Sequence, residues 1–318
     1  MKITAALHSP AQTVAAATIG VAMLLSVAAC GTSDATDTSA SAGASGSSSA
    51  STQGFDVSAV AKDDAIAALV PDSVKSDGKL SVGMELSYAP AEFLAADGTT
   101  PLGYDVDISK ALAKVMGLEA DIVSSTFDSI VPSVGAKYDL GITAMTITPE
   151  RLDAVDFVSY YKAGSTWAVK KGNPNGVDTS NLCGLKVAVQ TGTVQEQEAN
   201  DANANCPADR KIEVLSSKLQ TDAATNVVTG KADVFYADSP VAGYAISQTG
   251  GQLEALGGNV GSVKQGIAIR KGDSAMDEAV LKAVTKLMDD GTYLNILKHW
   301  GVESGALDKA EINPTDLE

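Results

Sequence analysis

The chain has 318 residues, of which 45% are hydrophobic and 19% charged, and 39 acidic side chains against 23 basic ones give a formal net charge of −16. This length accommodates one large domain or two small ones, each able to bury a core. An acidic chain repels phosphate, and no cluster of Lys or Arg interrupts the acidic background. We therefore expect no nucleic-acid partner.

Residue types that carry catalysis and metal binding are scarce. The only histidines are His8 and His299, which is too few for a histidine-rich metal site and argues against a Ser/His/Asp triad. No two glycines stand two positions apart and no Gly-Lys pair precedes Ser or Thr, which excludes the dinucleotide and P-loop motifs. The sequence predicts no metal, no cofactor and no enzyme activity.

The first thirty residues have the pattern of an export signal. Lys2 precedes an apolar run from Val14 to Val27 that is short for a membrane span, and the run ends in Val27-Ala28-Ala29-Cys30. This ending resembles the bacterial lipoprotein signal, so we expect residues 1–29 to be a signal peptide and Cys30 to be lipidated. The alternative is an ordinary secretory signal with an incidental cysteine.

A polar segment follows Cys30. Residues 31–54 are almost entirely Ser, Ala, Thr, Gly and Asp, a composition that buries too little apolar surface to offset the entropy cost of ordering. We expect residues 30–54 to be the lipidated cysteine and a disordered tether, with a typical reach of about 27 Å.

Two cysteines remain, Cys183 and Cys206. In an exported chain an even number favours a disulfide, and the alternative is two buried free thiols.

The rest of the chain alternates between short strands and amphipathic helices. We expect a helix at Asp105–Met116, a second at Ser274–Asp290 and a last one ended by Gly301. The expected strands are Leu80–Met84, Asp121–Ser124, Thr166–Lys170, Lys186–Gln190, Ala232–Tyr236 and Gly266–Arg270. This alternation indicates an α/β fold.

Several short motifs occur in an order that is typical of one family. They are Tyr88-Ala89-Pro90, Leu102-Gly103-Tyr104-Asp105-Val106-Asp107, Thr146-Ile147-Thr148-Pro149-Glu150-Arg151, Val155-Asp156-Phe157, Gln190-Thr191-Gly192-Thr193 and Asp290-Gly291-Thr292-Tyr293. Together they resemble the bacterial extracellular solute-binding proteins, family 3, which deliver polar amino acids to ABC importers.

The resemblance implies a two-lobed periplasmic-binding-protein-like (type II) fold with the ligand in a cleft between the lobes. Lobe 1 would comprise residues 75–160 and 266–318, and lobe 2 residues 165–261, with hinge crossings near 160–164 and 262–265. His299 and Trp300 match a structural position of the family.

The ligand carboxylate is expected at two helix starts. Thr148 as N-cap and Pro149 at the first helical position predict a helix that places Arg151 in its first turn, where the helix dipole disfavours a cation. The family's matching arginine binds the ligand carboxylate, beside the residue that matches Thr146. The alternative for Arg151 is a surface ion pair with Glu150 or Asp153.

On lobe 2, Gly192 allows close backbone approach and Thr193 with Glu196 has capping-box spacing. The free backbone N–H groups of Thr193 and Val194 are candidate carboxylate donors, and the alternative is a capped helix without a ligand role.

The ligand ammonium is expected at Asp238, which follows the strand Ala232–Tyr236 and matches the family's acceptor. Ala144 and Thr146 match further ammonium positions, and Ala144 would contribute its carbonyl. The alternative for Asp238 is N-cap of the helix near Pro240, a role that Ser239 can also fill.

The ligand side chain is expected between Tyr88 and Phe127, which match the family's aromatic pair. Gln190 and Gln195 match positions that face this side chain, and Glu85 stands where many members have Asp. A buried carboxylate needs a partner, so we expect a side chain that is cationic or donates hydrogen bonds.

The predicted protein is a monomeric, lipid-anchored extracytoplasmic receptor that captures a free amino acid and delivers it to an ABC permease and its ATPase. The alternatives are a dehydratase-like enzyme of the same fold, with Glu85 as its acid, and a ligand-sensing lipoprotein.

Overall fold

The computed structural model describes residues 53–318. The predicted signal peptide, Cys30 and most of the predicted tether lie outside these residues. In the described part of the chain, no helix is long and apolar enough to cross a membrane.

Nine α-helices and eleven β-strands make up the described residues. The helices are α1 (Asp64–Leu69), α2 (Asp72–Lys75), α3 (Tyr104–Met116), α4 (Pro149–Ala154), α5 (Val194–Ala204), α6 (Gln220–Val228), α7 (Ser239–Gln248), α8 (Ser274–Asp289) and α9 (Thr292–His299). The strands are β1 (Lys79–Met84), β2 (Ser87–Tyr88), β3 (Glu92–Leu94), β4 (Pro101–Leu102), β5 (Glu119–Ser124), β6 (Leu140–Gly141), β7 (Val155–Lys170), β8 (Lys186–Gln190), β9 (Glu213–Ser217), β10 (Val234–Asp238) and β11 (Leu253–Arg270). Short 3₁₀ turns are η1 (Phe127–Ser129), η2 (Val131–Ser133) and η3 (Glu303–Gly305).

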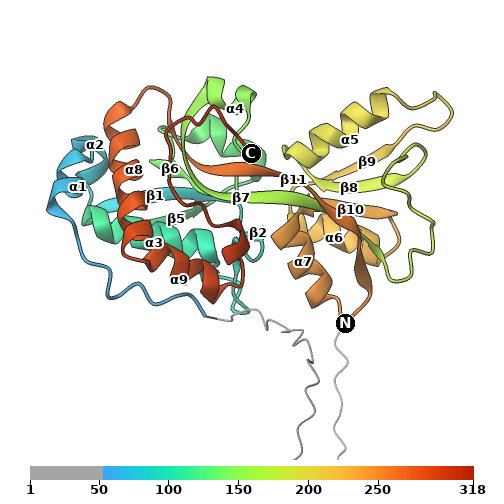
Figure 1. Cartoon of the computed structure of the whole chain (residues 1–318), viewed down its shortest axis with the longest axis horizontal. Coiled ribbons are helices and arrows are strands. Elements are labelled where there is room, and N and C mark those ends of the chain that lie inside the picture. Colours follow the sequence, from blue (N-terminus) through green and yellow to red (C-terminus); the bar gives the residue numbers. More distant parts are fainter. Residues whose placement is uncertain (1–52) are drawn as a thin grey trace, which may run out of the picture. The chain divides into compact units, whose positions relative to one another are not determined.

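One eight-stranded sheet with the order β5-β1-β6-β11-β7-β10-β8-β9 organises both lobes (Figure 1). Its two middle strands, β7 and β11, are antiparallel and remain paired from Val155↔Arg270 to Lys170↔Leu253. Strands β5, β1 and β6 belong to the first lobe, and β10, β8 and β9 to the second. The parallel pairs are β1 with β5 and β6, and β8 with β9 and β10.

The expected strands Thr166–Lys170 and Gly266–Arg270 are the ends of these two longer strands rather than separate elements. The predicted crossings, residues 160–164 and 262–265, are the middles of the same strands, where the pairing shifts register between Gln265 and Gly266. Glycine and polar residues from Gly257 to Gln265 interrupt the apolar pattern of β11, and Lys162 and Gly164 interrupt that of β7, which explains why sequence periodicity did not predict the full strands.

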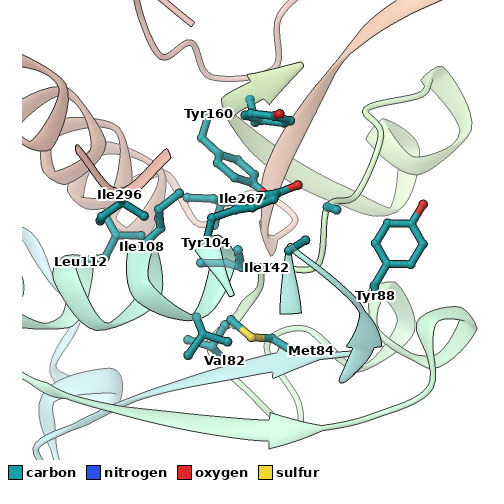
Figure 2. Close-up of a cluster of buried hydrophobic side chains, with 14 of the residues drawn as sticks. Val82, Met84, Tyr88, Tyr104, Ile108, Leu112, Ile142, Tyr160, Ile267 and Ile296 are labelled. Carbon is teal, nitrogen blue, oxygen red and sulfur yellow. The ribbon is translucent and has the colours of Figure 1, made fainter. Parts of the chain in front are cut away.

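Successive side chains of the sheet strands contribute to different cores, as a period of two requires. Ala188 packs in the largest cluster, whereas its neighbours Val187 and Val189 pack in a second one under α5. The largest cluster includes residues of α3, α8 and α9 in the first lobe and of α6 and α7 in the second. Figure 2 shows its first-lobe part, with Tyr104, Ile142 and Ile267 close together.

Most predicted boundaries are within two residues of the structure. Helix α3 ends before Gly117, which adopts a left-handed φ of 74°. Helix α8 ends at Asp289, and Gly291 occupies the N-cap position of α9. Strand β10 begins at Val234 and includes Asp238, so Asp238 ends this strand instead of following it.

Elements before residue 75 also pack on the first lobe. Helix α1, capped by Asp63, contacts α3 and α8, and it was not among the predicted elements. Gln53 lies within the predicted tether, and its carbonyl oxygen is 2.7 Å from His299 Nε2. The Phe55 N–H and the Trp300 indole N–H both donate to Asp107 Oδ2. His299 therefore contacts this segment, and Trp300 shares the acceptor Asp107 Oδ2 with Phe55.

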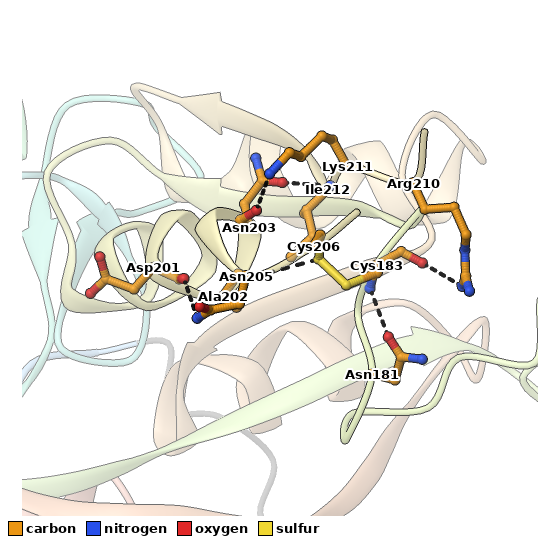
Figure 3. The surroundings of a disulfide bond; sticks show 10 residues. All are labelled: Asn181, Cys183, Asp201, Ala202, Asn203, Asn205, Cys206, Arg210, Lys211 and Ile212. Atoms are coloured by element: carbon orange, nitrogen blue, oxygen red, sulfur yellow. Dashed lines mark hydrogen bonds between the residues drawn. A yellow bond between two sulfur atoms is a disulfide. The ribbon is translucent and has the colours of Figure 1, made fainter. Parts of the chain in front are cut away.

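The structure joins Cys183 and Cys206 in a disulfide that closes a loop of 23 positions in the second lobe (Figure 3). The Arg210 guanidinium donates to the Cys183 carbonyl oxygen at 2.8 Å. The bridge ties the end of α5 to the loop before β8, away from the predicted ligand residues.

Candidate functional site

Arg151 lies where the two lobes meet. Thr148 is the N-cap of α4, and its hydroxyl accepts the Arg151 N–H at 3.2 Å. The guanidinium donates to the Thr146 carbonyl oxygen at 2.6 Å and to the Gly192 carbonyl oxygen of the second lobe at 3.0 Å. It also lies 5.3 Å above the centre of the Phe127 ring. Burial lowers the pKa of Arg151.

The structure does not show the alternative role of Arg151, a surface ion pair with a neighbouring acid. No ion pair between Arg151 and Glu150 or Asp153 occurs among the described residues. The cation is therefore held by neutral carbonyls and an aromatic face, which leaves its charge uncompensated at hydrogen-bonding distance.

The second-lobe loop from Gln190 to Glu196 differs in detail from the predicted capping box. The Thr193 hydroxyl donates to the Gln190 carbonyl oxygen at 2.7 Å and accepts the Glu196 N–H at 3.1 Å. The Glu196 carboxylate accepts the N–H of Gly192 at 2.6 Å rather than that of Thr193. This is because Gly192, with φ of 84°, turns its own N–H toward that carboxylate.

The loop leaves its backbone donors with weak internal partners. The Thr193 N–H is 3.4 Å from the Gln190 carbonyl oxygen, which is at the long limit for such a bond. Val194 is the first residue of α5, where backbone N–H groups have no partner within the helix. The hydroxyl of Thr193 thus serves the cap, and the backbone N–H groups are the better candidates for an anion.

Asp238 is a buried carboxylate with neutral partners. Its two oxygens accept from the side-chain amides of Gln195 and Gln265, each at 2.7 Å. Burial raises the pKa of Asp238 to about 6, and hydrogen bonds and the charge of Arg151 partly oppose this shift. Asp238 occupies the N-cap position of α7, but neither its side chain nor that of Ser239 caps the helix.

Glu85 connects the lobes at another point. Its Oε2 atom accepts from the Ser87 hydroxyl at 2.9 Å and from the Gln190 amide at 2.8 Å. The carboxylate is buried, which raises the pKa of Glu85 above its ordinary value. The Gln190 Oε1 atom is also buried and has no hydrogen-bond partner among the described residues.

The remaining predicted residues lie near these groups. Tyr88 and Phe127 are both buried, on β2 and η1. Burial and the charge of Asp238 raise the pKa of Tyr88 well above 10. Ala144 has a left-handed φ of 46°, and Thr146 forms an isolated bridge with Gln265.

Gln265, which the sequence predicted only as part of a hinge crossing, also lies in the site. Its amide donates to Asp238, and its Oε1 atom is buried without a partner among the described residues. In the sequence, Gln265 is a polar residue directly before the predicted strand Gly266–Arg270, and this position could have indicated a site residue. Ser165, whose hydroxyl accepts from Gln195 at 2.9 Å, was also missed.

Hydrogen bonds between described residues join the two lobes directly at this site. They connect Gln190 with Glu85, Arg151 with Gly192, and the Gln220 N–H with the Ser87 hydroxyl at 2.8 Å. The resulting site contains one cation and two carboxylates, none of which forms an ion pair among the described residues. No group of His, Cys, Asp and Glu there could hold a metal ion.

Comparisons with known proteins agree on one family. The model described as "Bacterial extracellular solute-binding proteins, family 3" matches residues 80–303. The chain is 36% identical to the arginine-binding protein ArgT of Corynebacterium glutamicum over 79% of this chain and 84% of that protein.

Solved structures give the same result. An ancestral arginine-binding protein bound to arginine is similar with a TM-score of 0.66 and 33% identity, over 70% of this chain and 98% of that one. An ancestral amino acid-binding protein, described as a precursor of cyclohexadienyl dehydratase, is similar with a TM-score of 0.65 and 34% identity. The match covers 72% of this chain and 98% of that one.

Proposed function

The chain belongs to the bacterial extracellular solute-binding proteins of family 3, and from this membership and the site we propose that it captures a basic amino acid, with arginine the first candidate, for an ABC importer. The observation that carries the proposal is the charge balance of the buried site. Arg151 is its one cation, whereas Asp238 and Glu85 are two carboxylates held only by neutral amides and hydroxyls. A ligand with one carboxylate and two cationic groups complements this set.

Each charge of the ligand would have its own partner. The carboxylate would bind the Arg151 fork and the backbone N–H groups of Thr193 and Val194, beside Thr146. The ammonium would bind Asp238, with the carbonyl of Ala144 and with Thr146 as further contacts. The cationic side chain would extend between Tyr88 and Phe127 toward Glu85 and Gln190, while Gln195 orients Asp238.

The names of the relatives support this ligand class. ArgT is an arginine-binding protein, and one solved neighbour contains bound arginine. The neighbour related to a dehydratase is itself described as an amino acid-binding protein. We therefore propose binding and release without turnover, which is checked by recovering the bound amino acid unchanged.

We also propose that the protein is anchored to the membrane by lipid, which is more specific than the extracytoplasmic location of its family. Residues 1–29 would direct export, Cys30 would carry lipid, and the following polar segment would tether a monomeric receptor to the membrane. In cells that make the wild-type protein, we expect it in the membrane fraction, and we expect the Cys30→Ala protein in the medium or periplasm. Membrane retention of the Cys30→Ala protein would contradict the anchor.

Titration calorimetry against the twenty amino acids tests the ligand class. We expect L-arginine to bind most tightly, followed by lysine and histidine. Tightest binding to aspartate or glutamate would contradict the proposal, because it would place a third carboxylate beside Glu85.

A charge-specific variant sharpens this test. Glu85→Gln should weaken arginine binding at least tenfold and glutamine binding much less, because only the cation loses a charge partner. Glu119→Gln, an exposed change on β5, should leave both affinities unchanged. Equal losses for the two ligands would place Glu85 away from the ligand side chain.

A further inference from the structure

A second pair of acidic residues lies buried in the first lobe, outside the predicted ligand contacts. Glu92 is on β3 and Asp105 is in the first turn of α3, and both are essentially inaccessible to solvent. The Asp105 N–H donates to the Ala91 carbonyl oxygen at 2.9 Å, which holds the two elements together. Neither side chain has an ion pair among the described residues. Because no cation among the described residues offsets their charge, the burial of these two carboxyl groups must be explained in another way.

The hydrogen bonds distinguish the two groups. Asp105 accepts at both oxygens, from the Ala144 N–H at 2.7 Å and from the Tyr160 hydroxyl at 2.6 Å. Glu92 accepts at Oε1 from the Thr143 hydroxyl at 2.6 Å, but its buried Oε2 has no donor among the described residues. A carboxyl group whose two oxygens both accept hydrogen bonds favours the ionised form. A buried carboxyl group with one oxygen that receives no donor favours the protonated form.

The surroundings add no positive charge. Among the described residues, the titratable groups electrostatically coupled to this pair are Glu85, Tyr88, Tyr104, Tyr160 and Tyr161, all of which are acids. Burial and the charge of Asp105 raise the pKa of Glu92 well above its ordinary value, while burial raises the pKa of Asp105 only to about 6. Two neighbouring carboxyl groups in such a place retain one proton between them.

The pair connects directly to the segment that would receive the ligand ammonium. The Thr143 hydroxyl, which donates to Glu92, also accepts the Glu85 N–H at 3.1 Å. Asp105 binds the N–H of Ala144, a residue with φ of 46°. This left-handed conformation costs energy for alanine and persists only where neighbours hold it.

We propose that Glu92 and Asp105 are a positioning pair that shares one proton, carried by Glu92, and that holds Thr143 and Ala144 in place for the ligand ammonium. The ionised Asp105 fixes the strained Ala144, so that its carbonyl faces the ligand. The neutral Glu92 receives the Thr143 hydroxyl and donates its proton toward Asp105. The part of this proposal that concerns the ligand rests on the proposed function.

Two isosteric variants separate the roles. By calorimetry with L-arginine at pH 7.5, Glu92→Gln should bind within about twofold of wild type, because the amide replaces a neutral acid. Asp105→Asn should bind at least tenfold more weakly, because its amide group cannot accept from both Ala144 and Tyr160 and the negative charge is lost. Equal losses, or the greater loss in Glu92→Gln, would contradict the assignment of the proton.

A measurement without ligand tests the proton shared by Glu92 and Asp105 separately from the proposed amino-acid binding. Carbon-13 NMR of the wild-type side-chain carboxyl groups, with Glu92 assigned by its absence in Glu92→Gln, should show a neutral Glu92 at pH 7. An ionised Glu92 would overturn the pairing even if arginine binds. If wild type binds no amino acid while Glu92 is neutral, the proposed function fails and the pairing survives.

The pH dependence of stability is a second readout that needs no ligand. The pKa of Glu92 is higher in the folded protein than in the unfolded chain, so stability is lost as pH rises from about 4.5. The Glu92→Gln protein lacks this loss, so its melting temperature relative to wild type should rise between pH 4.5 and pH 8. Exposed Glu119→Gln should show no such trend. A constant difference for Glu92→Gln would contradict the proposal.

Discussion

Asp238 is a buried residue of the candidate site that has no charged partner at hydrogen-bonding distance among the described residues. Its carboxylate has 5% exposure and is held by two amides, so no cation within the described residues cancels its charge at hydrogen-bonding distance. Glu85 is a second buried acid with a raised pKa, and its partners are one hydroxyl and one amide. Such groups lower stability when ionised, and a cationic ligand is what would recover that cost.

The raised pKa of Asp238 predicts pH-dependent binding. With a pKa of about 6, Asp238 is mostly ionised at pH 7 and about one-tenth ionised at pH 5. Because the ligand ammonium needs the ionised form, affinity for L-arginine should fall about tenfold or more between pH 7 and pH 5, measured by calorimetry. The stability that this group contributes has the opposite sign, since it is present below pH 4 and lost as pH rises through 6.

A substitution gives the matching control for this pH effect. Asp238→Asn should bind L-arginine weakly at every pH, with a flatter profile than wild type. An affinity in wild type that stays constant from pH 7 to pH 5 would contradict the ammonium assignment.

Among the elements, the paired strands β7 and β11 run through both lobes. At Gly164 they approach so closely that an added Cβ would lie 2.1 Å from the Gly261 carbonyl oxygen and 2.9 Å from that of Val260. These are backbone atoms and cannot rotate away as a side chain can. The close crossing therefore depends on the absence of a side chain at this position.

Gly164→Ala should consequently destabilise the protein by about 1–3 kcal/mol, a typical cost of overpacking. For a protein of this size that corresponds to a melting temperature lower by several degrees. Gly258→Ala is the matched control on β11, because nothing lies within 4 Å of its added Cβ and its φ is not left-handed. Equal melting temperatures for the two variants would show that the crossing tolerates a side chain.

At the scale of the whole folded body, both lobes contribute to one site through contacts that cross between them. Arg151 and Glu85 of the first lobe contact Gly192 and Gln190 of the second. A ligand that binds both sides stabilises the arrangement in which they meet, so binding should shift the population toward closed lobes.

Small-angle scattering tests this expectation. The radius of gyration of the wild-type protein should decrease when L-arginine is added, and the Arg151→Ala protein should show no decrease because one anchor of the ligand is missing. Arg210→Ala, an exposed change near the disulfide, should respond as wild type does. A decrease in Arg151→Ala equal to that of wild type would place the carboxylate site elsewhere.

Local features of the chain could be predicted because their causes are local. The cap at Thr148 and the glycine that ends α3 depend on neighbours a few positions away. The resemblance of ordered motifs identified the family, and the family model confirms it. Residue roles at the ligand remain predictions, although Arg151, Glu85 and Gln190 do lie where the lobes meet.

Other features were decided only by tertiary structure. The chain by itself determined an α/β fold, the ends of several helices, an acidic composition without metal or nucleotide motifs, and the residues that match the family. Only the folded structure showed that Gln265 donates a hydrogen bond to Asp238 and that Glu92 is buried next to Asp105. The reason is physical: these contacts join residues distant in sequence, and the preference of a carboxyl group for its proton depends on burial and neighbours that sequence patterns do not contain.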